Sequence, residues 1–128
     1  MTRQFHILVA DRNRHVRELL RRELMAEGYT VQLARDSREV MTCVEGTRIP
    51  DLLILDPDIP NLEGISMLES LSARRPPLPV VVHSLAAESG NPAPMPTVAA
   101  LVEKSGDTDH LKRVILQVLQ KYYPNHLG

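Results

Sequence analysis

Short apolar runs alternate along the chain with longer stretches in which apolar residues recur every three or four positions. The runs are typical of strands buried on both faces of a parallel sheet, and the periodic stretches are typical of helices that bury one side. This pattern predicts an α/β fold. We expect strands at residues 5–10, 30–33, 52–55, 80–83 and 99–102. We expect helices at about residues 14–27, 37–45 and 63–73, and from about residue 108 onward.

Polar residues and a glycine mark the expected helix ends. Asn13 and Asp107 stand where the first and last helices would be capped, because a short polar side chain can accept hydrogen bonds from the free N–H groups of a first helical turn. Either Asp36 or Ser37 takes this position before the second helix. Gly28 follows the first helix, as a glycine commonly does at a helix C-terminus.

The stretch from residue 89 to residue 96 interrupts the alternation. It contains three prolines and a glycine, and each proline inside a helix costs about 3 kcal/mol. We therefore expect the helix between the fourth and fifth strands to be shortened or irregular.

Five strands joined by crossover helices predict a doubly wound, flavodoxin-like parallel sheet with the strand order 2-1-3-4-5. This order places the first and third strands side by side. Asp11 and Asp56 directly follow these two strands, so they would face each other at the carboxyl edge of the sheet, where open α/β folds build their sites. Ser84 and Lys104 follow the fourth and fifth strands and would reach the same edge.

Composition and charge are those of an ordinary soluble domain. The 128 residues are 43% hydrophobic, and 15 basic against 16 acidic residues give a formal charge of −1. Nothing global therefore favours a nucleic acid or a membrane as partner. Cys43 is the one cysteine, which excludes an internal disulfide and a cysteine-pair metal site. We expect a single domain over residues 1–128, without signal peptide or membrane span, in the cytoplasm.

The five histidines show no spacing that suggests a metal site. His83, directly before Ser84, is expected to be a hydrogen-bonded residue of the core or rim. The other four are expected on the surface: His6, His15, His110 and His126.

Several motifs together resemble the receiver domains of two-component response regulators over nearly the whole chain. They are the apolar run that ends in Asp11, the Glu27-Gly28-Tyr29 turn, the apolar run that ends in Asp56, Pro60 and Gly64 at the spacing that follows this aspartate, and Ser84 and Lys104 on later strands. Each motif alone is weak, but their shared order and spacing are specific.

The resemblance implies that Asp56 is the phosphoacceptor, which takes a phosphoryl group from a histidine kinase or a phosphotransfer protein. It implies Mg²⁺ as cofactor, bound by the carboxylates of Asp11 and Asp56 and by the backbone carbonyl of Asp58. Lys104 would offset the charge of the transferring group. Ser84 would hydrogen-bond the phosphoryl group and act as a switch residue.

Three positions depart from the family pattern. Receivers carry a second acid after the first strand, which contacts Mg²⁺, whereas this chain has Arg12, whose guanidinium cannot ligate a metal. If Arg12 reaches toward Asp56, its own charge occupies the cation's place, and the Mg²⁺ site is either weak or lost. Ser105 replaces the proline that usually follows the lysine. Leu101 replaces the usual aromatic switch residue.

These features leave three hypotheses. The first is a signalling receiver that accepts a phosphoryl group on Asp56 and acts by binding an output protein. It would be no enzyme beyond self-phosphorylation and self-dephosphorylation, with no direct contact to nucleic acid or membrane. The second is a pseudo-receiver that binds partners without phosphorylation, because Arg12 replaces a magnesium-binding acid. The third is a haloacid-dehalogenase-like phosphatase with Asp56 as nucleophile and Asp107 as a later acidic motif, although its spacing fits poorly.

Overall fold

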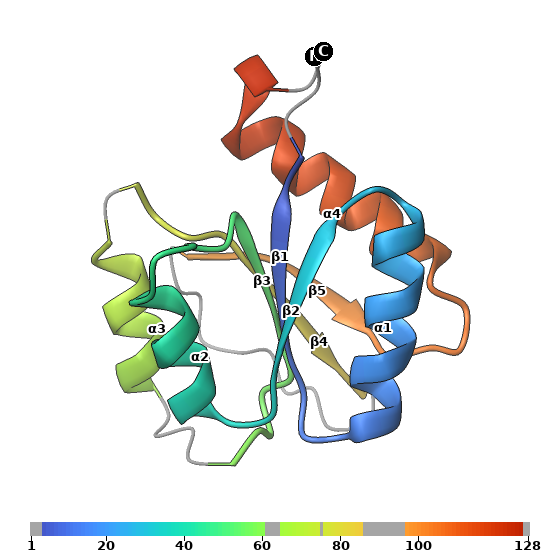
Figure 1. Ribbon diagram of the computed structural model, residues 1–128, viewed down its shortest axis with the longest axis horizontal. Coiled ribbons are helices and arrows are strands. Elements are labelled where there is room, and N and C mark those ends of the chain that lie inside the picture. The colour runs from blue at the N-terminus through green and yellow to red at the C-terminus, as the bar shows by residue number, and fades with distance from the viewer. Residues whose placement is uncertain (1–3, 61–64, 75, 86–96, 127–128) are drawn as a thin grey trace.

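The computed structural model describes residues 4–60, 65–74, 76–85 and 97–126, and Figure 1 shows a central sheet with helices on both sides. Five parallel strands form the sheet in the order β2-β1-β3-β4-β5. The strands are β1 (His6–Ala10), β2 (Thr30–Ala34), β3 (Leu52–Leu55), β4 (Val80–Ser84) and β5 (Val98–Glu103). The helices are α1 (Arg14–Ala26), α2 (Ser37–Val44), α3 (Ile65–Ser72) and α4 (Asp109–Tyr122), followed by the 3₁₀ turn η2 (Pro124–His126). The predicted fold class and strand order are confirmed.

The sheet separates two hydrophobic cores (Figure 1). α1 and α4 pack against one face, where Leu20 and Ile115 are buried. α2 and α3 pack against the other face, where Val40 and Leu71 are buried. The central strands β1 and β3 are buried at every position, which explains the apolar runs at residues 7–10 and 52–55. None of the helices in the described ranges is long and apolar enough to cross a membrane.

The observed element boundaries lie within one or two residues of the predicted ones wherever both are described. β3 spans the predicted residues, β4 extends one residue further to Ser84, and β5 is one residue longer at each end. Two predicted features fall on residues outside the described ranges. These are the shortened or irregular helix expected around residues 89–96 and the beginning of the third helix, expected at about residue 63. Both stay predictions.

The caps of the first two helices are confirmed. The Oδ1 atom of Asn13 accepts hydrogen bonds from two backbone N–H groups of the first turn of α1, at 2.8 and 3.3 Å. Asp36 caps α2 by accepting a hydrogen bond from the backbone N–H of Glu39 at 2.9 Å. Gly28 ends α1 with a φ of 96°, a left-handed conformation that favours glycine because it has no Cβ.

The predicted cap of the last helix was wrong by one residue. α4 begins at Asp109 and its N-cap is Thr108, while Asp107 lies before the helix and its Oδ1 accepts the backbone N–H of Asp109 at 2.9 Å. The hydroxyl of Thr108 donates to Oε1 of Glu23 in α1, at 3.0 Å. Because Thr108 is used in this contact between distant segments, the local sequence could not show which residue precedes the helix.

The expectation that His6 lies on the surface was also wrong. His6 is buried, because β1 lies between β2 and β3 in the sheet. Its ring nitrogens lie 2.9 Å from the hydroxyl oxygen of Thr30 and 3.1 Å from the side-chain oxygen of Gln32, both on β2. Polar partners on the neighbouring strand therefore let a histidine begin a central strand.

Candidate functional site

The two predicted acids meet at the carboxyl edge of the sheet. Ala10 and Leu55, the last residues of β1 and β3, pair in register, so Asp11 and Asp56 follow them on adjacent strands. The backbone N–H of Asp56 donates to the carbonyl of Ala10 at 2.8 Å. Each aspartate is only 1% exposed. The sheet therefore holds two carboxylates side by side, as the sequence predicted, and it holds them in a place that water barely reaches.

Lys104 supplies a positive charge to both carboxylates. It follows β5, and its Nζ lies 3.1 Å from Oδ2 of Asp11 and 3.5 Å from Oδ2 of Asp56. Its backbone N–H donates to the carbonyl of Ser84 at 2.7 Å, which ties the loop after β5 to the end of β4. Ser84 itself is buried at the end of β4. The structure thus brings all four predicted residues to one edge of the sheet.

Arg12 also reaches Asp56, as its position in the sequence suggested. Its backbone N–H donates to Oδ2 of Asp56 at 3.2 Å. The Nε of its guanidinium lies 3.8 Å from the same oxygen, and one terminal nitrogen lies 3.8 Å from Oδ2 of Asp58. The Arg12 side chain remains 47% exposed. Oδ2 of Asp56 therefore lies between two cations, a buried ammonium and a half-exposed guanidinium.

Backbone contacts fix the orientation of both acids. Oδ1 of Asp56 accepts the backbone N–H of Asp58 at 3.0 Å, and Oδ1 of Asp11 accepts the backbone N–H of Asn13 at 2.8 Å. Arg17 in α1 donates from its guanidinium to the carbonyl of Asp11 at 2.7 Å. The sequence analysis missed this role of Arg17. The short distance in sequence between Asp11 and the start of α1 could have indicated this contact, because it makes the first turn of the helix face the end of β1.

Burial shifts the acid–base properties of the site. Desolvation raises the pKa of Asp11 above its usual value, although the backbone N–H of Asn13 and the ammonium of Lys104 both act in the opposite direction. Burial and, to a lesser extent, the charge of Lys104 lower the pKa of His83 to about 4, while the charge of Asp56 opposes the shift. At neutral pH His83 is therefore uncharged.

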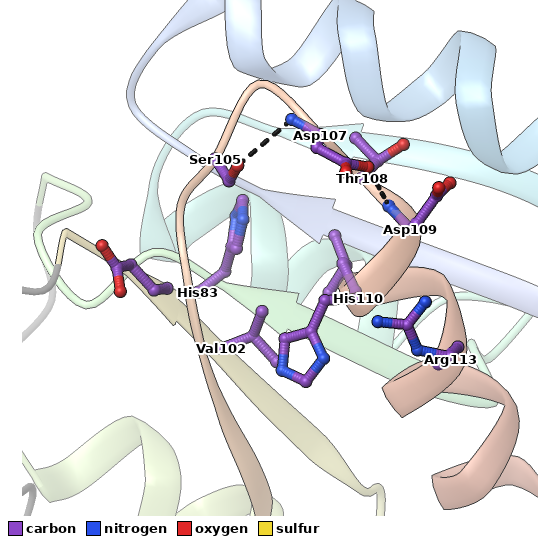
Figure 2. Close-up of a pocket in the computed structure, with 10 residues that line it drawn as sticks. His83, Val102, Ser105, Asp107, Thr108, Asp109, His110 and Arg113 are labelled. Atoms are coloured by element: carbon purple, nitrogen blue, oxygen red, sulfur yellow. Dashed lines mark hydrogen bonds between the residues drawn. The ribbon is translucent and has the colours of Figure 1, made fainter.

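The core or rim position expected for His83 is confirmed, but one of its ring nitrogens lacks the expected hydrogen bond. His83 precedes Ser84 on β4 and is 5% exposed, and among the described residues its Nδ1 has no hydrogen-bond partner. Its ring lines a hollow of about 390 Å³ beside the loop between β5 and α4. Figure 2 shows that the wall of this hollow comes from β4, β5, that loop and the first turn of α4. A neutral imidazole whose Nδ1 has no partner among the described residues thus lies near the ammonium of Lys104.

A second hollow, of about 380 Å³, borders the site on the side of α1. Its lining includes the cations Arg12 and Lys104, and the apolar side chains of Val16, Leu19 and Leu85. The positively charged side of the pocket therefore faces open space in which an anionic group of a partner would be attracted.

The residues do not fit a magnesium ion in this arrangement. Mg²⁺ requires near-octahedral oxygen ligands. Each carboxylate oxygen of Asp11 and Asp56 already contacts a donor of the chain, either a backbone N–H or a cationic side chain. Within the described residues, no group of three or more His, Cys, Asp and Glu side chains could hold a metal ion. A divalent ion would have to displace Arg12, which stands where a further acid would be needed.

The third sequence hypothesis depended on Asp107 as a late acidic motif. Asp107 is exposed, and its carboxylate accepts the backbone N–H of Asp109 in the turn that leads into α4. Its observed contact is therefore that of a turn residue.

Comparisons with known proteins point to one family. The family model described as the response regulator receiver domain matches residues 7–115. The response regulator MprA of Mycolicibacterium vanbaalenii is 42% identical over 76 residues, which cover 59% of this chain and 32% of that protein. MprA of Mycobacterium ulcerans is 43% identical over a segment of the same length. The chain spans about a third of the length of these curated relatives.

Solved structures show the same architecture. The response regulator TrrA of Thermotoga maritima, in complex with Mg²⁺ and beryllium fluoride, has a TM-score of 0.80 at 25% identity, with 91% of this chain and 100% of that chain covered. TrrA in complex with the histidine kinase ThkA has a TM-score of 0.75 at 27% identity, with 91% of this chain and 99% of that chain covered.

Proposed function

Because the chain belongs to the response regulator receiver family, we propose that it is a signalling module in which Asp56 accepts a phosphoryl group and which then acts by binding other proteins. The observation that carries this proposal is the position of Asp56. It is a buried carboxylate held by the end of β3, with the ammonium of Lys104 at 3.5 Å. A phosphoryl acceptor needs a nucleophile in a fixed orientation and a nearby positive charge.

The transfer would use Asp56 as a nucleophile. A carboxylate oxygen attacks the phosphorus of a phosphohistidine on the donor, the P–N bond breaks and the O–P bond forms. The electron pair of the broken bond stays on the imidazole nitrogen, which takes up a proton from solvent. Asp56 becomes an acyl phosphate that carries a charge of roughly −1.5 to −2. Lys104 offsets the charge that spreads over the transferring oxygens.

Phosphorylation would be read out by the segments next to the site. Three strong acceptor oxygens would appear near the end of β4, and the hydroxyl of Ser84 would donate a hydrogen bond to one of them. The backbone link from Lys104 to Ser84 joins β4 to the loop after β5. Leu101 on β5 is 42% exposed. A shift of this loop would therefore alter a surface that a partner can contact.

The partners follow from this role. The donor would be a histidine kinase or a phosphotransfer protein. A solved relative, TrrA, is bound to such a kinase. The partner that receives the output signal would be a protein, and we propose no direct contact of this chain with nucleic acid. A magnesium cofactor, which the family generally uses, is not part of the proposed step, because Arg12 and Lys104 already contact the carboxylates.

A second candidate is a pseudo-receiver, which binds partners without being phosphorylated. The observation that favours it is the contact of Arg12 with Asp56 and Asp58, both at 3.8 Å. An arginine that neutralises the pocket permanently could hold one conformation without any chemistry. The two candidates differ in whether Asp56 can be modified.

Exposure to phosphoramidate, a small phosphoryl donor, separates them. We expect the intact mass to increase by one phosphoryl group, and Asp56→Asn to abolish the increase. Asp58→Asn is the matched control, because it changes a nearby acid that does not act as the nucleophile. A folded protein that gains no mass in either the presence or absence of Mg²⁺ would rule out phosphorylation and leave the pseudo-receiver.

A further inference from the structure

The strongest unexplained feature of the pocket is its charge. Asp11 and Asp56 are opposed by Arg12 and Lys104, so the buried acids are neutralised by the chain itself. The family pattern would put an acid at position 12. An arginine in place of an acid raises the charge of the pocket by two, which is the charge of one divalent cation. The substitution is therefore matched in charge to the loss of a bound Mg²⁺.

The surroundings of one carboxylate oxygen of Asp56 show the same neutralisation. Oδ2 of Asp56 has three donors of this chain around it: the backbone N–H of Arg12 at 3.2 Å, the ammonium of Lys104 at 3.5 Å and the Nε of Arg12 at 3.8 Å. A phosphoryl group attached to this oxygen would place its own oxygens between the two cations. A cation bound to both a carboxylate and a phosphoryl group would have to occupy this same space.

The guanidinium of Arg12 has donors to offer. Its distances to the oxygens of Asp56 and Asp58 are both 3.8 Å, beyond hydrogen-bond range, so these contacts are electrostatic attractions that leave the N–H groups able to bind another acceptor. Its side chain is 47% exposed, which leaves room for it to turn. A planar guanidinium binds two oxygens of a phosphoryl group at once, a geometry that an ammonium does not offer.

We propose that Arg12 takes the place of the divalent cation, so that the pocket binds a phosphoryl group on Asp56 through Arg12 and Lys104 without a metal ion. This inference rests on the proposed function of Asp56 and adds the mode of recognition. Lys104 contributes a fixed charge and Arg12 a two-donor contact. Phosphorylation is then independent of the Mg²⁺ concentration.

Fluorine NMR with beryllium fluoride tests this directly. This anion has the shape and charge of a phosphoryl group and bonds to a carboxylate oxygen. Protein and buffer are first passed over a chelating resin, and the residual metal is measured. We expect a bound fluorine signal in the metal-depleted sample that requires Asp56 and changes little on addition of Mg²⁺.

Substitutions at position 12 make the test specific. Arg12→Gln should weaken metal-free binding at least about tenfold, because a hydrogen bond to a charged group is lost. Arg12→Lys keeps the charge but not the planar fork and should bind with intermediate strength. Arg12→Asp should lose metal-free binding and regain a bound signal when Mg²⁺ is added. Arg14→Gln, at the exposed first residue of α1 and two positions after Arg12, is the matched control and should bind like the parent protein.

The outcomes separate this inference from the proposed function. A bound signal that appears only with Mg²⁺ would overturn the role of Arg12 while leaving Asp56 as phosphoacceptor. No bound signal under any condition, from a protein with a folded NMR spectrum, would overturn both. Equal metal-free binding by Arg12→Gln and the parent would also overturn the role of Arg12, because Lys104 alone would then suffice.

Discussion

His83 occupies an environment very different from that of a histidine in an unfolded chain. It is buried beside Lys104, and its Nδ1 has no partner among the described residues. Because an imidazolium in this position would be desolvated and repelled by the ammonium, the folded protein holds the ring neutral. The same neutrality prevents a further positive charge from competing with Lys104 for the carboxylates.

This environment predicts a pH dependence of stability. The pKa of His83 is about 4 in the folded protein against 6.5 for the free side chain. Between these pH values the unfolded chain binds more protons, so the free energy of unfolding falls as the pH is lowered. We expect a loss of up to about 3 kcal/mol between pH 7 and pH 4 from this residue alone.

Urea unfolding of the parent protein and of His83→Leu over this pH range measures the effect. The difference between the two free energies of unfolding should change with pH by the stated amount, because all other titrating groups are shared. His15→Leu, at an exposed position, controls for the removal of a histidine. A difference that is constant with pH would contradict the buried, neutral state of His83.

The C-terminal end of helix α1 depends on a left-handed backbone conformation at Gly28. Gly28 has a φ of 96°, with no atom within 4 Å of where a Cβ would stand. Gly28→Ala should therefore reduce the free energy of unfolding by about 1 kcal/mol through backbone strain alone. Gly106→Ala is a matched control, because its Cβ also meets open space and its φ lies outside the left-handed region. Equal effects of the two substitutions on thermal unfolding would contradict this account.

The elements that the sequence predicted best are those whose causes are local. β1 and β3 are predicted from the apolar runs at residues 7–10 and 52–55, because central parallel strands are buried on both faces. Asn13 is recognised as a cap because its partners lie within the next turn. The prediction of Asp107 as the last cap failed because Thr108 bonds to Glu23, 85 positions away, and such a contact leaves no local signal.

The sequence was sufficient to predict which residues meet at the site, but it predicted fewer of the contacts between them. Asp11, Asp56, Ser84 and Lys104 come together because strand order and strand ends determine where they lie. The contact of Arg12 with Asp56 was a hypothesis that the structure supports with a distance of 3.8 Å. The unpartnered nitrogen of His83 could not be predicted, since it depends on which side chains cover the end of β4.

At the scale of the whole molecule, the site is coupled to the surface through β4 and β5. Val82 pairs with Leu101, and the carbonyl of Ser84 accepts the backbone N–H of Lys104. We propose that a group bound at Asp56 acts through this pair of strands, of which β5 carries the exposed Leu101.

If β4 and β5 connect the site to the surface, a substitution can abolish the structural response of β5 without abolishing anion binding at Asp56. In the parent protein, occupation of Asp56 by beryllium fluoride should shift the backbone amide resonances of Leu101 and its neighbours on β5. Ser84→Ala should still bind the anion but show much smaller shifts on β5, because the hydroxyl that draws β4 toward the bound group is absent. Ser105→Ala, in the adjacent loop, is the control. Shifts of the same size in Ser84→Ala would contradict the role of Ser84 as a switch.

The central claim is that Asp56 accepts the phosphoryl group. The most direct measurement is reductive trapping: the protein is treated with phosphoramidate and then with borohydride, which converts an aspartyl phosphate to homoserine, and peptide mass spectrometry locates the converted residue. We predict homoserine at position 56 alone, with Asp11 and Asp58 unchanged. Conversion at another aspartate, or none in a folded protein, would contradict the account.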